Sequence, residues 1–385
     1  MPDLLITPGS LLDRIRRKVR QLAGRPDPSP WVLYPHRPAA ARGRIDFVIA
    51  LDYMTMNGGM IDQLHRAMSR YGLSTLLVNR QNVDRVLRLA RLGRIRPAVF
   101  LDLCSTRNDP YEQLLHTLAD QGVHTLRDPS QTKWIVKASA HRLLQPHVPV
   151  PPTVVFAKEE ADRDLTVAER ELLGDRVAIK PSCGGAGRGV RLNVEPTLQN
   201  IADARAQDRS DDWLVQRMMP FVMLGDRIGY FRLYNVLGHL NVMWWSPSDH
   251  HYATFTWADL DRYRLWPLLG IAHRIAQITR MEYFSVEAAY TGEEGPHRLC
   301  LIDYVNDQCD MDAFNPGCPP PEWTAWVCER LALRTYQVKH RIAVEEQCSV
   351  TLAGAPPVAL RDLPMDIDAD LANRADAKIF GSERT

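Results

Sequence analysis

The sequence predicts an α/β protein, in which a small domain with a parallel sheet is followed by a larger region of mixed strands and helices. Two observations predict this class. Between residues 44 and 126, short apolar runs alternate with segments of helical periodicity, which is the pattern of βαβ units. Residues 176–192, RVAIKPSCGGAGRGVRL, have the pattern of a strand, a glycine-rich loop and a second strand.

The first domain, expected over residues 44–128, is half of a doubly wound, Rossmann-like fold. Its strands are expected at 44–51, 74–79, 97–103 and near 124–126, and its helices at 60–72, 82–93 and 110–122. The first turn carries Asn57, Gly58 and Gly59, which either open a helix N-terminus to an anion or form a plain glycine turn. Asn57 and Arg107, which ends the third strand, are candidates to meet a substrate from this side.

The second region begins with a helix, a strand and an acidic helix, expected over 130–144, 150–157 and 159–174. The glycine-rich segment follows, and further strand-like segments lie within 211–220, 230–244, 284–290 and 299–307. From residue 348 to residue 385 the chain is polar and lacks a clear period. We expect this tail to be a loose cover or disordered.

Residues 1–43 precede the first domain. Residues 11–22, LLDRIRRKVRQL, have the pattern of a basic amphipathic helix, and residues 24–43 have the composition of a linker. Membrane-surface attachment and an organelle transit peptide are open for this helix, but we favour packing on the body or on a partner subunit. The sequence leaves a homodimer open.

The composition excludes several classes of protein. The 385 residues carry 47 Lys and Arg against 46 Asp and Glu, and this balance argues against nucleic acid as the partner. No apolar run approaches the roughly 18 residues of a membrane span, and the N-terminus lacks the apolar core of a secretory signal. Seven cysteines without a CxxC pair or a zinc-ligand spacing predict free thiols. We therefore expect a cytoplasmic protein without a membrane span.

Lysine is scarce in this arginine-rich chain. The seven lysines are Lys18, Lys133, Lys137, Lys158, Lys180, Lys339 and Lys378, which leaves 40 arginines. Genome composition accounts for the bias at any single position. A lysine that is kept among arginines can still serve where a compact ammonium must contact a phosphate.

The glycine-rich loop is a candidate phosphate site. Gly184, Gly185, Gly187 and Gly189 allow the backbone to bend and to point several N–H groups at a phosphate chain. Lys180 ends the preceding strand and is within reach of the same oxygens. The GxxxxGK[ST] phosphate loop and the GxGxxG dinucleotide fingerprint are both absent. Taken alone, the segment is more typical of a structural turn.

The order of these segments resembles the ATP-grasp superfamily, whose members include D-alanine–D-alanine ligase, glutathione synthetase and the glutamate-adding ligases of ribosomal protein. The resemblance covers roughly residues 45–340 and rests on six ordered segments. It implies an ATP-grasp fold with a small lobe and its glycine loop over 129–220. A large lobe with the metal site would span 221–347.

The resemblance implies that ATP lies between the two lobes. Lys133 and Lys180 resemble the two lysines that reach the phosphates, and Lys137, one helical turn after Lys133, is a weaker candidate. The loop from Gly184 to Gly189, which includes Arg188, would close over the β- and γ-phosphates.

Residues at the junction of the lobes resemble the adenine site. Gln216, Arg217, Met218 and Met219 resemble the linker whose main chain bonds the adenine edge and whose apolar side chains hold its face, although core packing is the commoner role of methionine. Asp226 is a candidate for the ribose hydroxyls. Arg232 resembles the arginine beside the transferred phosphate, where a fixed cation stabilises developing charge. An exposed strand arginine is the alternative.

The resemblance also implies a metal site for Mg²⁺, as two ions, with Mn²⁺ as a substitute. Glu287 and Asp303 match the family's carboxylates, but Asn306 stands three residues after Asp303 where the family has two. Because i and i+2 share a face of a strand and i and i+3 do not, Asn306 can share a metal with Asp303 only if the strand ends or bulges near Val305. Asp307 and Asp310 are rival ligands, and pairing of the acids with arginines is the alternative to metal binding.

The resemblance implies a ligase. ATP would activate a carboxylate as an acyl phosphate, and an amine, from an amino acid or a peptide, would attack it. Residues 244–266 are rich in aromatic residues and carry His250 and His251, and they form either a specificity loop or an ordinary surface loop. A kinase of the same fold, with a base within 249–263, and an ATP-binding regulator without catalysis are the alternatives.

Overall fold

The computed structural model describes residues 45–52, 54–104, 109–185, 187–249, 251–293, 298–311, 318–344, 348–352 and 356–363. The basic helix and linker predicted before residue 44 lie outside the described residues, as do Arg107, His250 and most of the tail. The chain divides into two compact units. The first contains residues 1–129, 310–315 and 319–345, and the second contains residues 130–309, 316–318 and 346–385.

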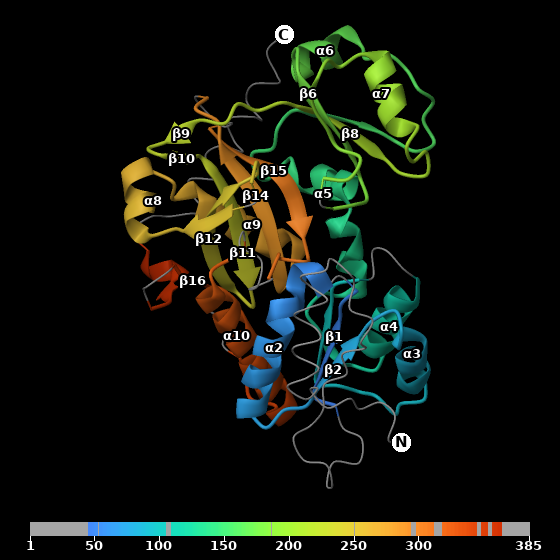
Figure 1. The fold of residues 1–385 in the computed structure, drawn as a ribbon, viewed down its shortest axis with the longest axis vertical. Coiled ribbons are helices and arrows are strands. Elements are labelled where there is room, and N and C mark those ends of the chain that lie inside the picture. The colour runs from blue at the N-terminus through green and yellow to red at the C-terminus, as the bar shows by residue number, and fades with distance from the viewer. Residues whose placement is uncertain are drawn as a thin grey trace, which may run out of the picture. The chain divides into compact units, whose positions relative to one another are not determined.

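The first unit contains the parallel sheet that the sequence predicts, in the order β2–β1–β3–β4 (Figure 1). Its elements are β1 (Phe47–Ala50), α2 (Met54–Arg70), β2 (Thr75–Val78), α3 (Val83–Arg91), β3 (Val99–Asp102), α4 (Asp109–Asp120) and β4 (His124–Thr125). Val48 and Ala50 share a core with α3 and α4. Phe47 and Ile49, which alternate with them and are also buried, point to the opposite face. Asn57 falls in α2, and its side chain lies outside the described part of the chain.

A helix from the far end of the sequence belongs to this first unit. Helix α10 (Pro321–His340) packs along α2 and also contacts β3. Near its end, the Lys339 ammonium lies 3.0 Å from the Asp46 carboxylate, which also accepts hydrogen bonds from the Ser74 amide and hydroxyl at 3.0 and 3.1 Å. The predicted large lobe, 221–347, therefore includes a helix that the structure groups with the first unit.

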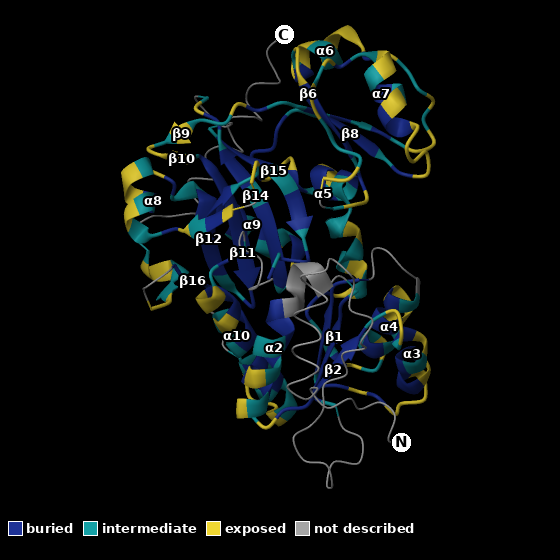
Figure 2. Ribbon diagram, in the orientation of Figure 1, coloured by how far each residue is buried: buried dark blue, intermediate teal, exposed yellow. Residues whose placement is uncertain are grey.

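One lobe of the second unit is built on a four-stranded antiparallel sheet in the order β5–β8–β6–β7. We call residues 153–217 the small lobe. Its elements are β5 (Thr153–Phe156), α6 (Val167–Leu173), β6 (Val177–Pro181), β7 (Arg191–Val194), α7 (Leu198–Arg205) and β8 (Trp213–Arg217). The acidic helix expected from residue 159 begins at Val167, because Thr166 and Glu169 form a capping box there. The outward faces of α6 and α7 are exposed (Figure 2).

The helix predicted over 130–144 is divided in two. A 3₁₀ helix, η1 (Pro129–Ile135), is followed by α5 (Lys137–Leu144). Val136 separates them with an extended backbone (φ −90°, ψ 118°). The break removes Lys133 and Lys137 from a common helix face.

We call residues 223–306 the large lobe. Its elements are β9 (Met223–Leu224), β10 (Arg227–Ile228), β11 (Tyr230–Val236), β12 (His239–Ser246), β13 (His251–Thr254), α8 (Trp257–Tyr263), α9 (Pro267–Thr279), β14 (Tyr283–Tyr290) and β15 (Leu299–Asn306). A seven-stranded sheet has the order β15–β14–β11–β12–β16–β17, with β13 also paired to β12. Its last strands are β16 (Ser349–Val350) and β17 (Val358–Ala359), which precede a short 3₁₀ helix, η3 (Leu360–Asp362).

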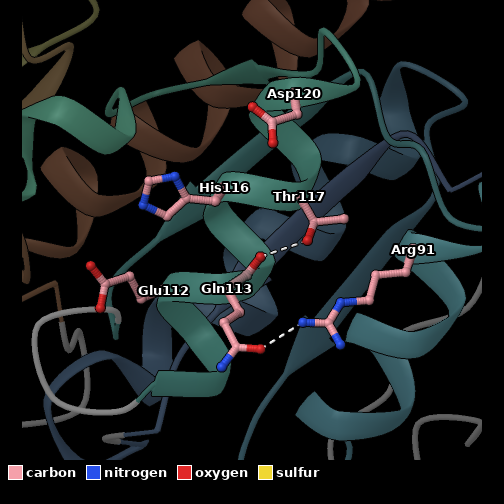
Figure 3. Close-up of a pocket in the computed structure, with 6 residues that line it drawn as sticks. All are labelled: Arg91, Glu112, Gln113, His116, Thr117 and Asp120. Atoms are coloured by element: carbon pink, nitrogen blue, oxygen red, sulfur yellow. Dashed lines mark hydrogen bonds between the residues drawn. The ribbon is translucent and has the colours of Figure 1, made fainter.

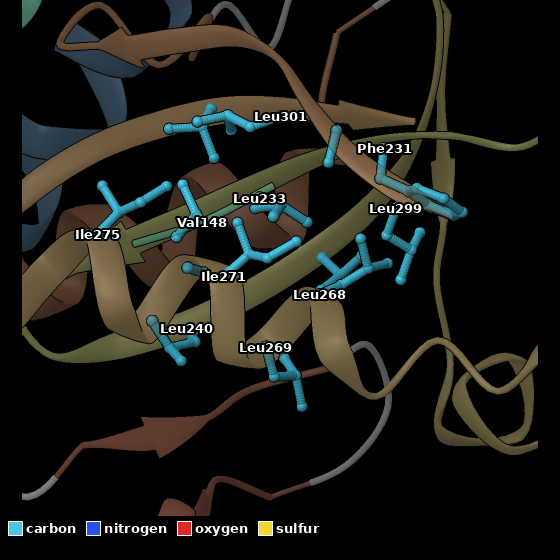
Figure 4. Close-up of a cluster of buried hydrophobic side chains, with 14 of the residues drawn as sticks. Val148, Phe231, Leu233, Leu240, Leu268, Leu269, Ile271, Ile275, Leu299 and Leu301 are labelled. Atoms are coloured by element: carbon cyan, nitrogen blue, oxygen red, sulfur yellow. The ribbon is translucent and has the colours of Figure 1, made fainter. Parts of the chain in front are cut away.

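Helix α9 supplies the core of the large lobe. Leu268, Ile271 and Ile275 pack in one cluster with Phe231 and Leu301 of the sheet (Figure 4). Side chains at alternate positions of each strand therefore face α9, and those between them face the opposite side of the sheet. That opposite side is the one that carries the charged residues described below.

Two further observations bear on the sequence expectations. The seven cysteines are free thiols, as their spacing predicts. Among the helices of the described residues, none is both long and apolar enough to cross a membrane.

Lys339→Met should destabilise the first unit, because it leaves the nearly buried Asp46 carboxylate without its ammonium partner. We expect the free energy of opening of β1 and α10, measured by native-state hydrogen exchange of the full chain, to fall by about 1–3 kcal/mol. Lys158→Met is the matched control, since Lys158 lies 3.8 Å from Glu159 at the surface, where pairs contribute little. An equal effect of both substitutions on the first unit would contradict this role of Lys339.

Candidate functional site

A row of charged side chains crosses three neighbouring strands of the large lobe. Arg232 on β11 lies opposite Glu287 on β14, and Glu287 lies opposite Asp303 on β15. Residues that are directly opposed share a face of the sheet, and this face is the one turned away from α9. Arg232 forms an ion pair with Glu287, and the Tyr230 hydroxyl donates to Glu287 Oε2 at 2.8 Å.

Strand β15 reaches this arrangement through two register shifts. Leu301 pairs with Ala288, Asp303 pairs with Glu287, and Asn306 pairs with Ser285. One extra residue of β15 therefore lies on each side of Asp303, as in a β-bulge.

The first shift turns Asp303 away from the core. In a regular strand Asp303 would share a face with Leu299 and Leu301, which pack in the cluster around α9. The extra residue, Ile302, reverses this parity and places Asp303 beside Glu287. Because of this shift, the Asp303 carboxylate lies beside that of Glu287 and does not point into the apolar core.

The second shift answers the question that the sequence leaves open about Asn306. Tyr304 and Val305 together oppose Val286, and all three belong to the core cluster. Asn306 thereby returns to the face of Asp303, as a bulge near Val305 requires. Its Oδ1 accepts a hydrogen bond from the Gln308 amide at 2.8 Å.

The two rival ligands lie beyond the end of β15. Asp307 is buried and is the first residue after the strand. Asp310 belongs to the first unit. The register therefore favours Asn306 as the third member of the set.

The glycine loop is joined to the start of α5. The Lys137 amide donates to the Ser182 carbonyl at 3.0 Å, and the Ala138 amide donates to the Ser182 hydroxyl at 2.9 Å. Since α5 has no side-chain cap of its own at Val136, Ser182 satisfies two of its free amides. The end of β6 is thereby fixed against the helix.

The loop itself depends on glycine at three positions. Gly184, Gly187 and Gly189 have φ values of 132°, 66° and 74°. Residues with a side chain rarely adopt this backbone conformation. At Gly189 a Cβ atom would also lie 3.3 Å from Pro181 Cγ. Gly185 is partly exposed and Arg188 is exposed in the same loop.

Lys137 connects the loop to the row of charges. Its Nζ donates to the Gly184 carbonyl at 2.8 Å and lies 3.8 Å from Asp303 Oδ1. The sequence makes Lys137 the weaker candidate, but the structure places it between the glycine loop and a candidate metal ligand.

Lys133 lies in a different environment. It is exposed, and its ammonium lies 4.5 Å from the centre of the Trp134 ring. The break at Val136 accounts for the separation, because it ends the common helix face on which both lysines were expected. Of the two, Lys137 is the one that contacts the glycine loop.

Lys180 is almost fully buried. It donates to Gln216 Oε1 at 2.8 Å and to the Ile302 carbonyl at 3.0 Å. Burial lowers the pKa of Lys180, and the nearby Lys137 acts in the same direction, while Asp303 and Glu287 oppose them. The Ile302 carbonyl belongs to the extra residue of the first register shift, where the ladder is interrupted.

The carboxylates respond to the same charges. Burial opposes ionisation of Asp303, but Lys137, Lys180 and Arg232 outweigh it, so the pKa of Asp303 is lowered. Burial raises the pKa of Glu287, although Arg232 acts against it. Three cations and two carboxylates thus converge, and this excess of positive charge suits a polyphosphate.

The oxygen ligands fit Mg²⁺. Glu287 and Asp303 supply carboxylates, and Asn306 supplies an amide oxygen, on one face of the sheet. Within the described residues no cluster holds three or more His, Cys, Asp or Glu side chains suited to a metal. An ion here would take its other ligands from water and phosphate, as Mg²⁺ usually does.

The expected adenine linker differs in part from the structure. Gln216 lies within β8, and its side chain accepts a hydrogen bond from Lys180. The amides of Arg217 and Met218 donate to Pro152 and Arg176 carbonyls at 2.8 and 2.9 Å, so they are not available to an adenine edge.

Two further candidates lie on either side of β9. Met219 is buried and is the second residue after β8. Asp226 is exposed in the turn between β9 and β10. The burial of Met219 is equally compatible with an apolar wall and with the core.

The aromatic segment over 244–266 is an ordered part of the large lobe. Trp244 and Phe255 belong to its core, and their rings lie 5.3 Å apart. Trp245 and Tyr252 face each other across β12 and β13 with ring centres 4.5 Å apart. Packing therefore explains much of the aromatic content, and His251 is exposed.

Sequence reasoning missed Tyr304 and His141. The Tyr304 hydroxyl accepts from Gln216 Nε2 at 3.2 Å and lies 2.6 Å from His141 Nδ1. Both residues are close in sequence to candidate site residues, since His141 is one turn after Lys137 on α5 and Tyr304 follows Asp303. Only the fold brings them to Lys180.

A cavity of about 350 Å³ lies elsewhere, between α3 and α4 of the first unit (Figure 3). It is lined by Arg91, Glu112, Gln113, His116, Thr117 and Asp120. Arg91 donates to Gln113 Oε1 at 2.6 Å across it. None of the residues that the sequence predicts for the site lines this cavity.

Comparisons with known proteins agree with this architecture. No protein-family model matches the sequence, and no curated protein matches it at a significant level. Among solved structures, an ATP-grasp RimK domain protein from Sphaerobacter thermophilus is 20% identical, with a TM-score of 0.51 over 75% of this chain and 98% of its own.

Two further structures are similar at lower identity. D-alanine–D-alanine ligase from Bacillus anthracis in complex with ATP is 12% identical, with a TM-score of 0.53 over 78% of this chain and 99% of its own. The D-cycloserine synthetase DcsG is 13% identical, with a TM-score of 0.53 over 75% and 99%. At such identities the similarity shows the fold alone. The chain therefore has the ATP-grasp fold, as the resemblance in its sequence predicts.

Proposed function

We propose that the protein is an ATP-dependent ligase that activates a carboxylate as an acyl phosphate and joins it to an amine. The observation that carries the proposal is the meeting of two sets of residues. Lys137, Lys180 and the glycine loop come together with the row formed by Glu287 and Asp303. A fold whose solved members include ligases supports the same conclusion.

The cations would hold the phosphates of ATP. Lys180 would keep the position that Gln216 and the Ile302 carbonyl give it, with its third N–H free for a phosphate oxygen. Lys137 would exchange the Gly184 carbonyl for phosphate oxygens as the glycine loop closes. Arg232 would neutralise charge that develops on the transferred phosphoryl group.

Glu287, Asp303 and Asn306 would hold Mg²⁺. The charge of a bound Mg²⁺ would lower the repulsion that an anionic nucleophile meets at the phosphates. The chain's own part would be to keep these oxygens together on one face of the sheet, away from the apolar core. The two register shifts of β15 accomplish both.

The reaction balances without a covalent enzyme intermediate. A substrate carboxylate oxygen bonds to the γ-phosphorus while the bond to the bridging oxygen of ADP breaks. The amine nitrogen then attacks the acyl carbon, phosphate leaves, and the nitrogen loses a proton. Positioning and charge neutralisation by the protein suffice for these steps.

We propose an amino acid or a peptide as the source of the carboxylate and the amine. Among the structural neighbours, D-alanine–D-alanine ligase and D-cycloserine synthetase are named for small amino-acid products. PsnB, which is 13% identical with a TM-score of 0.51, has been solved with a minimal precursor, Mg and ADP. These names leave both a small molecule and a peptide as candidates.

The kinase alternative requires a general base within 249–263. Two acids of that segment already have structural partners, since Asp259 caps α8 through Thr256 and Asp261 accepts from Trp266 Nε1 at 3.0 Å. The regulator alternative depended on the spacing of Asn306. Because the bulge in β15 places Asn306 on the same face as Asp303, this spacing no longer argues against a metal site.

Lys137→Met should weaken binding of Mg-ATP more than Lys133→Met. Loss of a charge-assisted contact to phosphate corresponds to roughly 1.5–3 kcal/mol, or about 10- to 100-fold in Kd. Isothermal titration with a non-hydrolysable ATP analogue measures this difference. The reverse order would assign the phosphate contact to Lys133, as the sequence resemblance implies.

Hydroxylamine should trap the acyl phosphate. We expect ADP and a hydroxamate when the protein is mixed with Mg-ATP, hydroxylamine and the correct amino acid or peptide from a panel. Asp303→Asn is the control, because it should abolish turnover and still bind ATP. A stable phosphorylated product that needs no amine would support the kinase, and binding without turnover across the panel would support the regulator.

A further inference from the structure

A chain of buried hydrogen bonds runs from Lys180 to helix α5. Lys180 Nζ donates to Gln216 Oε1 at 2.8 Å, and Gln216 Nε2 donates to the Tyr304 hydroxyl at 3.2 Å. The Tyr304 hydroxyl lies 2.6 Å from His141 Nδ1. The four side chains come from β6, β8, β15 and α5. All four are buried, with exposed fractions of 8% or less.

The donors and acceptors of this chain have one consistent direction. The ammonium of Lys180 can only donate, so the oxygen of Gln216 must face it and the amide nitrogen must face Tyr304. The Tyr304 hydroxyl accepts from that nitrogen and has its own proton left for His141 Nδ1. When that proton is donated to Nδ1, His141 is neutral and carries its own proton on Nε2; the Tyr304 hydroxyl also has a hydrogen bond with Thr153.

The surroundings agree with this direction. Burial lowers the pKa of His141 to about 4, and the neighbouring Arg142 acts in the same sense. The side chain of Gln145, the residue that follows the end of α5, hydrogen-bonds to the same ring. Thr153, which faces Gln216 across β5 and β8, adds a longer contact of 3.4 Å from Gln216 Nε2.

The chain also joins the parts of the site that must act together. Tyr304 follows Asp303 and lies in the second register shift of β15, whereas Gln216 and Lys180 belong to the small lobe. His141 is one turn from Lys137 on α5, the helix whose first amides hold Ser182. A change at Tyr304 is therefore transmitted to Lys180 through a single amide.

We propose that Gln216, Tyr304 and His141 are positioning residues that fix the ammonium of Lys180 for the phosphate chain of ATP. The inference rests on the proposed function, since it assigns Lys180 to the nucleotide. None of the three residues touches the reacting atoms. Tyr304 is the central member, because its hydroxyl is the only link between His141 and Gln216 in the described hydrogen bonds.

A double-mutant cycle tests the proposal. Tyr304→Phe keeps the ring and removes the hydroxyl, and it should raise the Kd of the Mg-bound, non-hydrolysable ATP analogue about three- to tenfold, the range of one hydrogen bond. In a Lys180→Met background the same change should alter the Kd by less than about twofold, because the group that is positioned is absent. Tyr111→Phe is the matched control, since the buried Tyr111 hydroxyl donates to Asp52 at 2.5 Å in the first unit.

The outcomes separate this inference from the proposed function. Equal losses in both backgrounds would make Tyr304 a structural residue, and no loss in either would overturn the proposal outright. If the unaltered protein does not bind the analogue, the proposed function fails and the inference falls with it. If it binds and Tyr304→Phe binds equally well, only the inference fails.

A spectroscopic measurement needs no folded variant at Tyr304. Nitrogen NMR of the ¹⁵N-histidine-labelled full chain, with the His141 signals assigned by their loss in His141→Gln, reports which ring nitrogen carries the proton. We expect the neutral form with the proton on Nε2 at neutral pH. A proton on Nδ1 would contradict the direction of the chain.

Discussion

The candidate site depends on the register of a single strand. Without the two extra residues of β15, Asp303 would point into the leucine-rich core and Asn306 would lie on the face opposite to it. With them, Asp303 and Asn306 both lie on the face of the sheet that carries Glu287, and the Ile302 carbonyl is left to accept from Lys180. Bulges of this kind commonly re-aim side chains next to functional sites. The residues that we propose as metal ligands and the lysine that we propose for phosphate are thus coupled through the same irregularity.

Charge balance sets the second constraint. Two carboxylates and three cations are held partly or fully out of water, which is costly unless each is paired. Arg232 pairs with Glu287, Lys137 lies between Gly184 and Asp303, and Lys180 has two neutral acceptors. The hydrogen-bond acceptors of Lys180 are neutral, and Asp303 and Glu287 favour its charged form through their own charges. This arrangement favours an arriving polyanion over an internal ion pair.

The fold follows from the sequence more completely than the site does. Periodicity alone locates the parallel strands of the first unit and the three helices between them. The scarce lysines that the resemblance selects are Lys133 and Lys180, with Lys137 as the weaker candidate, whereas Lys339 has a structural partner in Asp46. The break at Val136 could not be predicted, because the local sequence continues a helical pattern and the tertiary contact with Ser182 decides the new start. For the same reason, only the packed sheet shows that Gln216 holds Lys180 and that α10 returns to the first unit.

The most direct measurement is a crystal structure of the full chain with Mg²⁺ and a non-hydrolysable ATP analogue. The account predicts Mg²⁺ bonded to oxygens of Glu287, Asp303 and Asn306 at about 2.0–2.1 Å, with the Lys180 ammonium on the phosphate chain and still on Gln216. A metal bound without Asp303 and Asn306, or a nucleotide bound away from the glycine loop, would contradict it.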